Sequence, residues 1–107
     1  MFEVKAIVRL DRRDEVIAAL HDIPGLPGLT VSTVEGIGRR HPHQEDYGRV
    51  TMAKIEIVVS EDHLTPVLDG LKRSAHTGRP GDGKVFVLCV DQAVRLQTGE
   101  TGLDALR

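Results

Sequence analysis

Apolar and polar residues alternate over residues 2–10, with the period of two that is typical of a half-buried strand. The apolar positions of this predicted strand are Phe2, Val4, Ala6, Val8 and Leu10. Apolar residues then recur at helical spacing over residues 16–23, and we expect Asp11 to cap this helix, with acidic residues in its first turn. Prolines and glycines within residues 24–28 end the helix and turn the chain.

Two further strands and a polar loop are predicted next. Residues 29–34 are rich in β-branched side chains and indicate a second strand, which Gly36 and Gly38 would end. Residues 39–49 are polar and predict a surface loop with Tyr47 as its only large apolar side chain. A third strand begins at residue 50 or 51 and ends at residue 59, with apolar residues on one face.

An amphipathic helix is predicted to follow this strand. Ser60 is the expected N-cap, and the apolar stripe of the helix comprises Leu64, Val67, Leu68, Leu71 and Ala75. Pro66 lacks an N–H and suits only the early turns, unless Thr65 is the true cap. A glycine-rich connection at residues 77–84 leads to a continuous apolar strand at 85–90, a short fifth strand at 94–98 and a tail from residue 99.

This order of elements indicates an α+β domain of the split β-α-β type. It predicts an antiparallel four-stranded sheet with two helices on one face. The 107 residues suffice for one domain with one core. The second face of the sheet would have no helix, so we expect an oligomer to cover it.

Composition narrows the function classes. A net charge of -2 excludes a basic field for nucleic acid or anionic lipid, and the scarcity of aromatic residues argues against base stacking. A single cysteine excludes an internal disulfide and fits a reducing cytoplasm. Because Cys89 lies inside an apolar run, we expect a buried structural thiol. No apolar run approaches the roughly 20 residues that span a bilayer, and no signal-peptide pattern is visible, so we expect a cytoplasmic protein.

The run Gly81-Asp82-Gly83-Lys84 is the most informative local feature. Glycines let backbone N–H groups converge on a phosphate, while Lys84 adds a point charge and Arg79 can add another. The alternative is a helix-to-strand turn that needs positive φ at two places, and the spacing alone favours this turn. The order of elements differs from that of a Walker A loop.

A second candidate is Gly36-Ile37-Gly38-Arg39-Arg40, whose two guanidinium groups could hold phosphate or carboxylate. A loop with solvated arginines is the simpler interpretation of this segment. No nucleophile with a base and no catalytic pair of carboxylates can be defended, so we do not expect an enzyme.

Two features leave alternatives open. His41 and His43 share the polar loop with acidic residues, which suggests a metal site, although surface loops collect such residues by default. Glu56 lies among apolar strand residues. It is either buried with a partner such as Lys54 or placed at the solvated rim of the sheet.

Several segments together resemble the PII signal-transduction proteins. Residues 77–87 are similar to the C-terminal signature of that family, and residues 94–100 continue the match. Residues 14–16, 28–31, 36–39 and 54–59 match in the same order. The resemblance covers nearly the whole chain except residues 40–53, and it makes the phosphate cradle the preferred interpretation of residues 81–84.

The resemblance implies a homotrimer of ferredoxin-like subunits that binds ATP or ADP between subunits and regulates partner proteins. The phosphates would be wrapped by Gly81, Asp82, Gly83 and Lys84, with Arg95 joining from the neighbouring subunit and Gln97 nearby. The adenine and ribose end would be lined by Gly28, Leu29, Thr30, Glu56 and Val58. The cleft would be closed by Ile7, Gly36, Ile37, Gly38, Arg39 and Phe86.

Some positions depart from the family pattern. Residues 39–53, which correspond to the mobile T-loop, form a shorter segment, and Tyr47 lacks the usual context of a uridylylated tyrosine. Arg40 replaces a glutamine that helps to hold Mg²⁺ and 2-oxoglutarate, and Met52 replaces a lysine that pairs with this acid. Gln97 replaces a second arginine near the phosphates, which should weaken triphosphate binding more than diphosphate or monophosphate binding.

These observations predict a regulator that binds ADP, AMP or ATP and signals through residues 39–53 to an enzyme or membrane transporter. Mg²⁺ or a small anion such as bicarbonate could accompany the nucleotide, and classical 2-oxoglutarate sensing is not expected. Residues 99–107 would form a C-terminal tail. The alternative is a metal-responsive trimer of the same fold, with His41 and His43 as ligands together with a neighbouring carboxylate.

Overall fold

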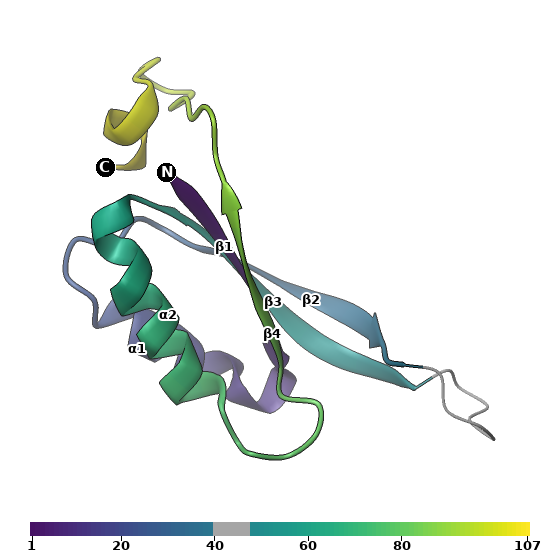
Figure 1. Cartoon of the computed structure of the whole chain (residues 1–107). Coiled ribbons are helices and arrows are strands. Elements are labelled where there is room, and N and C mark those ends of the chain that lie inside the picture. The colour runs from purple at the N-terminus through teal and green to yellow at the C-terminus, as the bar shows by residue number, and fades with distance from the viewer. Residues whose placement is uncertain (40–47) are drawn as a thin grey trace.

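The computed structural model describes residues 1–39 and 48–107 of the chain. Its four strands form one antiparallel sheet in the order β2-β3-β1-β4, and both helices lie on the same face of it (Figure 1). The elements are β1 (Phe2–Arg9), η1 (Leu10–Arg12), α1 (Arg13–His21), β2 (Thr30–Ile37), β3 (Arg49–Val59), α2 (Glu61–Ala75), β4 (Gly83–Cys89) and η2 (Gly102–Leu106). The predicted α+β, ferredoxin-like class is therefore confirmed.

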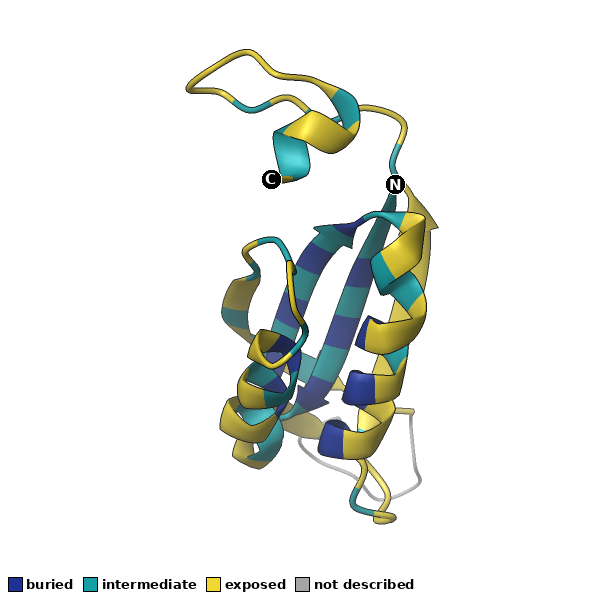
Figure 2. Cartoon of the chain, turned by 90° about the vertical axis from the view of Figure 1, so that its left-hand side faces the viewer, coloured by how far each residue is buried: buried dark blue, intermediate teal, exposed yellow. Residues whose placement is uncertain are grey.

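The core lies between the helices and the face of the sheet that they cover. Alternate residues of β1 and β3 are fully buried there, as the dark bands on the strands in Figure 2 show. The helices bury the apolar positions that the sequence pattern assigned to them. The buried core comprises Val4, Ala6, Val8, Ala53, Ile55, Ile57 and Val59 from the sheet, and Val16, Leu20, Val67, Leu71 and Ala75 from the helices.

The other face of the sheet carries no helix. Residues of β4 remain exposed along the whole strand, and Phe86 keeps 48% of its surface accessible in the single chain. Because an edge strand with exposed apolar side chains is prone to pair with another chain, the predicted oligomer has a physical basis. No helix of the described residues is long and apolar enough to cross a membrane.

The start of α2 resolves one open question about Pro66. Ser60 occupies the N-cap position with extended backbone angles, so Thr65 is not the cap. The Ser60 hydroxyl lies 3.5 Å from Nδ1 of His63, and its side chain makes no capping hydrogen bond to the helix. Pro66 lies inside the helix, where it leaves one backbone acceptor without its usual N–H donor.

Two predictions about element ends are wrong. Asp11 does not cap α1, since it lies in η1 and its carboxylate is near Arg9 and Arg79 instead. Gly36 does not end the second strand, because β2 continues to Ile37 and pairs Gly36 with Val50 of β3. Pairing with a long neighbouring strand therefore carries β2 past a residue that by itself disfavours strand structure.

The C-terminal segment also differs from the expectation. Residues 94–98 do not form a strand, since only Val94 makes an isolated bridge, to Thr101. The chain folds back through a turn at Gly99, and part of the predicted tail forms the short helix η2. The prediction of a buried thiol is wrong for the single chain, because Cys89 lies on the edge strand β4 and is exposed.

Candidate functional site

Eleven of the residues predicted to bind nucleotide line two pockets, which lie at opposite ends of the sheet. One group lines a pocket of about 650 Å³, here called the wide pocket, which includes Gly28, Thr30, Glu56, Val58 and Arg95. The second lines a pocket of about 220 Å³, here called the glycine pocket, which includes Ile7, Gly36, Ile37, Gly38, Gly81 and Gly83. The strand register places them apart, because Thr30 pairs with Glu56 at one end of β2 and Gly36 pairs with Val50 at the other.

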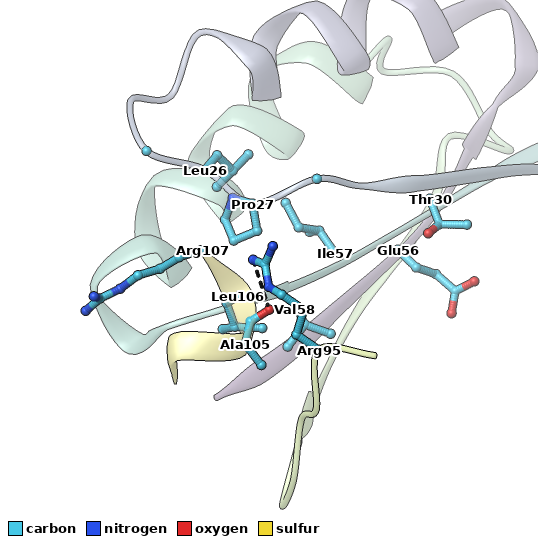
Figure 3. A pocket seen from close by; sticks show the side chains of 12 residues that line it. Leu26, Pro27, Thr30, Glu56, Ile57, Val58, Arg95, Ala105, Leu106 and Arg107 are labelled. Carbon is cyan, nitrogen blue, oxygen red and sulfur yellow. Dashed lines mark hydrogen bonds between the residues drawn. The ribbon is translucent and has the colours of Figure 1, made fainter. Parts of the chain in front are cut away.

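Three segments that are distant in sequence build the wide pocket (Figure 3). The loop between α1 and β2 contributes residues 25–28, and the end of β3 contributes Glu56, Ile57 and Val58. The third wall is the C-terminal segment, with Arg95 and residues 105–107. Because this segment was expected to be a strand followed by a tail, the sequence pattern did not indicate residues 105–107 as lining residues.

A turn of the C-terminal segment positions Arg95. The Arg95 backbone N–H donates to the Glu100 carbonyl at 2.8 Å, and the Gly99 N–H donates to the Arg95 carbonyl at 2.8 Å. Its side-chain Nη2 donates to the Ala105 carbonyl at 3.4 Å, and its Nε lies 3.9 Å from Oε1 of Glu100. The guanidinium is thus held at the pocket wall while about a third of the side chain stays exposed.

The environment of Glu56 combines features of both predicted alternatives, a partner at Lys54 and partial exposure to solvent. Its side chain is 29% exposed, and one carboxylate oxygen lies 3.5 Å from Nζ of Lys54. The pKa of Glu56 is lowered, chiefly by a hydrogen bond with the Glu3 side chain and then by Lys54. Glu56 is therefore ionised at neutral pH, and its oxygens can accept hydrogen bonds from the hydroxyl groups of a ligand.

The glycine pocket depends on a close approach between β4 and β1. Gly83 has φ of +98°, and a Cβ at this position would lie 1.8 Å from the Ile7 carbonyl oxygen. Gly81 also has a positive φ, of +91°. The structural interpretation of this loop, a turn that needs positive φ at two places, is therefore confirmed. The phosphate-cradle interpretation stays a prediction and is compatible with it.

The carboxylate of Asp82 organises the loop that contains these glycines. It accepts hydrogen bonds from the Thr77 N–H at 2.8 Å, from the Gly78 N–H at 3.0 Å and from the Thr77 hydroxyl. The side-chain hydrogen bond from Thr77, followed by its backbone N–H, lowers the pKa of Asp82 to about 2. The Asp82 side chain thus faces its own loop, and this predicted phosphate-binding residue lines neither the wide pocket nor the glycine pocket.

Several predicted residues line neither pocket. Leu29 packs against the core, and Lys84 and Phe86 lie exposed on β4. Arg39 and Gln97 are also exposed and lie outside both linings. Lys84 follows Gly83 directly and pairs with Ile7 in the sheet, so it is adjacent to the glycine pocket.

The metal hypothesis receives no support from the described part of the chain. His41 and His43 lie outside the described residues, as do Tyr47 and Arg40. Within residues 1–39 and 48–107, no group of three histidine, cysteine or acidic side chains is arranged to hold a metal ion.

Sequence reasoning missed two side chains that shape the pockets. Nε2 of His63, on α2, lies 3.1 Å from the Pro24 carbonyl and so holds the loop that forms one wall of the wide pocket. Arg9, at the end of β1, donates from Nη1 to the Pro80 carbonyl at 3.2 Å beside the glycine pocket. Neither residue carries a sequence signal, because each acts on a segment far away along the chain.

Comparison with known proteins agrees with this architecture. Residues 1–100 match the family model described as nitrogen regulatory protein P-II. The chain is 41% identical to the nitrogen regulatory protein P-II of Bradyrhizobium diazoefficiens, over 99% of this chain and 100% of that protein. It is 43% identical to that of Rhizobium etli, over 96% of this chain and 97% of that protein. The crystal structure of Arabidopsis thaliana PII bound to citrate superposes with a TM-score of 0.83 at 41% identity, covering 97% of this chain and 90% of that one.

Proposed function

The chain belongs to the P-II family of nitrogen regulatory proteins, and from this premise we propose that it is a homotrimer that binds adenine nucleotides in clefts between its subunits. Members of the family are signalling regulators, and this chain is a regulator and not an enzyme.

The proposal of a composite site rests on the distance between the wide pocket and the glycine pocket, each of which would form one half of the nucleotide site. The wide pocket and the glycine pocket lie at opposite ends of strands of about eight residues, which corresponds to about 20 Å or more. One nucleotide therefore cannot contact both within one chain. In a cyclic trimer, the wide pocket of one subunit can face the glycine pocket of the next, so that each cleft is complete only in the assembly.

The chemistry of each half suits a different part of the nucleotide. In the wide pocket, the ionised Glu56 can accept a hydrogen bond from a ribose hydroxyl, and the Arg95 guanidinium can pair with a phosphate. On the neighbouring subunit, the backbone N–H groups around Gly81 and Gly83 can approach the phosphates closely, and Lys84 adds a positive charge. With Gln97 in place of a second arginine, we expect ADP or AMP to bind at least as tightly as ATP.

The signal would pass through residues 39–53. Gly36, Ile37 and Gly38 line the glycine pocket and lead directly into this segment, so ligand contacts there can change the position of the segment. From the cytoplasm, the protein would pass that change on to a partner enzyme or to a membrane transporter. The Arabidopsis relative is bound to citrate, which agrees with a small anion such as bicarbonate as a second effector. Mg²⁺ is our other candidate.

Isothermal titration of the purified protein with ATP, ADP and AMP tests the ligand. Each nucleotide is titrated with and without Mg²⁺ and 2-oxoglutarate. We expect saturable binding, with ADP or AMP at least equal to ATP and no dependence on 2-oxoglutarate. Absence of binding by any nucleotide would refute the proposed function, and strong synergy between MgATP and 2-oxoglutarate would refute its specificity.

Mixed trimers test the composite site. Lys84→Ala and Arg95→Ala should each weaken nucleotide binding in homogeneous trimers. The Lys84→Ala chain and the Arg95→Ala chain are then given different tags, co-expressed and purified through both tags, so that every trimer contains both variants. In such a trimer, about a third of the clefts combine an intact Lys84 with an intact Arg95. We expect this fraction of sites to regain wild-type affinity. If no sites are regained, the two side chains do not meet in one cleft between subunits.

A further inference from the structure

Arg9 contacts the loop of residues 77–83 from outside it. The residue ends β1, its side chain is 24% exposed, and Nη1 donates to the Pro80 carbonyl at 3.2 Å. The same nitrogen lies 4.0 Å from Oδ1 of Asp82. A Cβ added at Gly81 would lie 3.7 Å from Nη1 of Arg9. The guanidinium therefore lies against three consecutive residues of the loop.

The charges around Arg9 are balanced by its protein neighbours. Its Nε lies 3.5 Å from Oδ1 of Asp11, and Oδ2 of Asp11 lies 3.9 Å from Nη2 of Arg79. Asp82 supplies a second carboxylate near Nη1. Two guanidinium groups thus face two carboxylates, which leaves little net charge to attract an anion. This arrangement fits a residue that holds the loop in place better than one that contacts a ligand phosphate.

The loop has a physical need for such an anchor. Gly78, Gly81 and Gly83 all have positive φ, and glycine loses more conformational entropy on ordering than any other residue. Asp82 secures the start of the loop through the N–H groups of Thr77 and Gly78. The bond from Arg9 to Pro80 secures its tip. A loop that is ordered before the ligand arrives does not lose this entropy on binding.

We propose that Arg9 is a positioning residue that preorganises the loop of residues 77–83 for its phosphate-bearing ligand. The inference rests on the proposed nucleotide function for its ligand, whereas the ordering of the loop is a property of the free protein. Arg9 lines an adjoining recess that shares Val50, Met52 and Gly81 with the glycine pocket. Because Arg9 itself lies outside the lining of the glycine pocket, it would act through the loop.

Hydrogen exchange of the nucleotide-free protein tests the ordering directly. Wild type, Arg9→Ala, Arg9→Lys and the control Arg13→Ala are compared on peptides that cover residues 77–83. Arg13 is also a partly exposed arginine with an acidic neighbour, Asp14, and it lies on α1. We expect exchange in this peptide to rise about tenfold in Arg9→Ala and less in Arg9→Lys, which keeps a positively charged donor group. The control should match wild type, and melting temperature and trimer content identify a variant that fails to fold.

Titration of the same four proteins with ADP then separates the outcomes. We expect about tenfold weaker binding in Arg9→Ala, partial recovery in Arg9→Lys and no change in Arg13→Ala. Unchanged exchange together with weaker binding would make Arg9 a direct ligand contact and overturn the inference. Unchanged binding with faster exchange would also overturn it. If wild type binds none of ADP, AMP and ATP, the proposed function fails, and the exchange result alone then decides whether Arg9 orders the loop.

Discussion

Replacement of Gly83 by alanine tests the close approach that forms the glycine pocket. The added Cβ would lie 1.8 Å from the Ile7 carbonyl oxygen, and contacts of this kind do not come under 3.0 Å, so the two backbones must separate by about 1.2 Å. A positive φ costs an alanine about 1–2 kcal/mol. The separation also disrupts the end pair of Val8 and Gly83, at about 1 kcal/mol for a hydrogen bond. The expected loss is therefore about 2–3 kcal/mol in the free energy of unfolding.

The matched control is Gly99→Ala. Gly99 has φ of +78°, and a Cβ there would meet nothing within 4 Å, so this substitution adds backbone strain without a clash. Thermal unfolding at one fixed protein concentration should show a decrease in Tm of about 10–20 °C for Gly83→Ala and about 5 °C for Gly99→Ala. Equal decreases for the two variants would refute the argument, because the contact with Ile7 would then contribute nothing.

Three further predictions follow from side-chain contacts. The pKa of Asp82 is lowered from 3.8 to about 2 in the folded protein. Its carboxylate therefore stabilises the folded state above about pH 4, and this contribution is lost as the pH falls through about 2. Acid titration of unfolding should show this loss in wild type and not in Asp82→Asn. Arg12→Ala removes the donor that satisfies the Ser74 carbonyl at 2.8 Å near the end of α2, and we expect a decrease in Tm of about 5 °C by calorimetry. An unchanged Tm would exclude this stabilising role. His63→Ala should speed hydrogen exchange in residues 24–28, whereas His63→Gln, which keeps a donor for the Pro24 carbonyl, should not; equal exchange in both variants would contradict the assignment.

Local patterns predicted most of the secondary structure. Alternation along β1 and β3 and the helical stripe of α2 depend only on which side chains one face of an element presents, so they are visible in the sequence. The predictions failed where a distant segment decides the outcome. β2 passes through Gly36 because β3 supplies a partner strand, and Asp11 leaves the helix end because arginines attract it.

The sequence by itself determined the fold class and, through several family-like segments, the residues from which a nucleotide site would be built. Tertiary structure decided how those residues are distributed. Strand register separates Glu56 and Arg95 from Gly81 and Gly83 and so divides the predicted site into two half-sites. Tertiary structure also brings Arg9 against the loop that contains Pro80, which lies 71 residues later in the chain. Side-chain periodicity is a local property, whereas contacts across a sheet depend on its topology, which no short segment encodes.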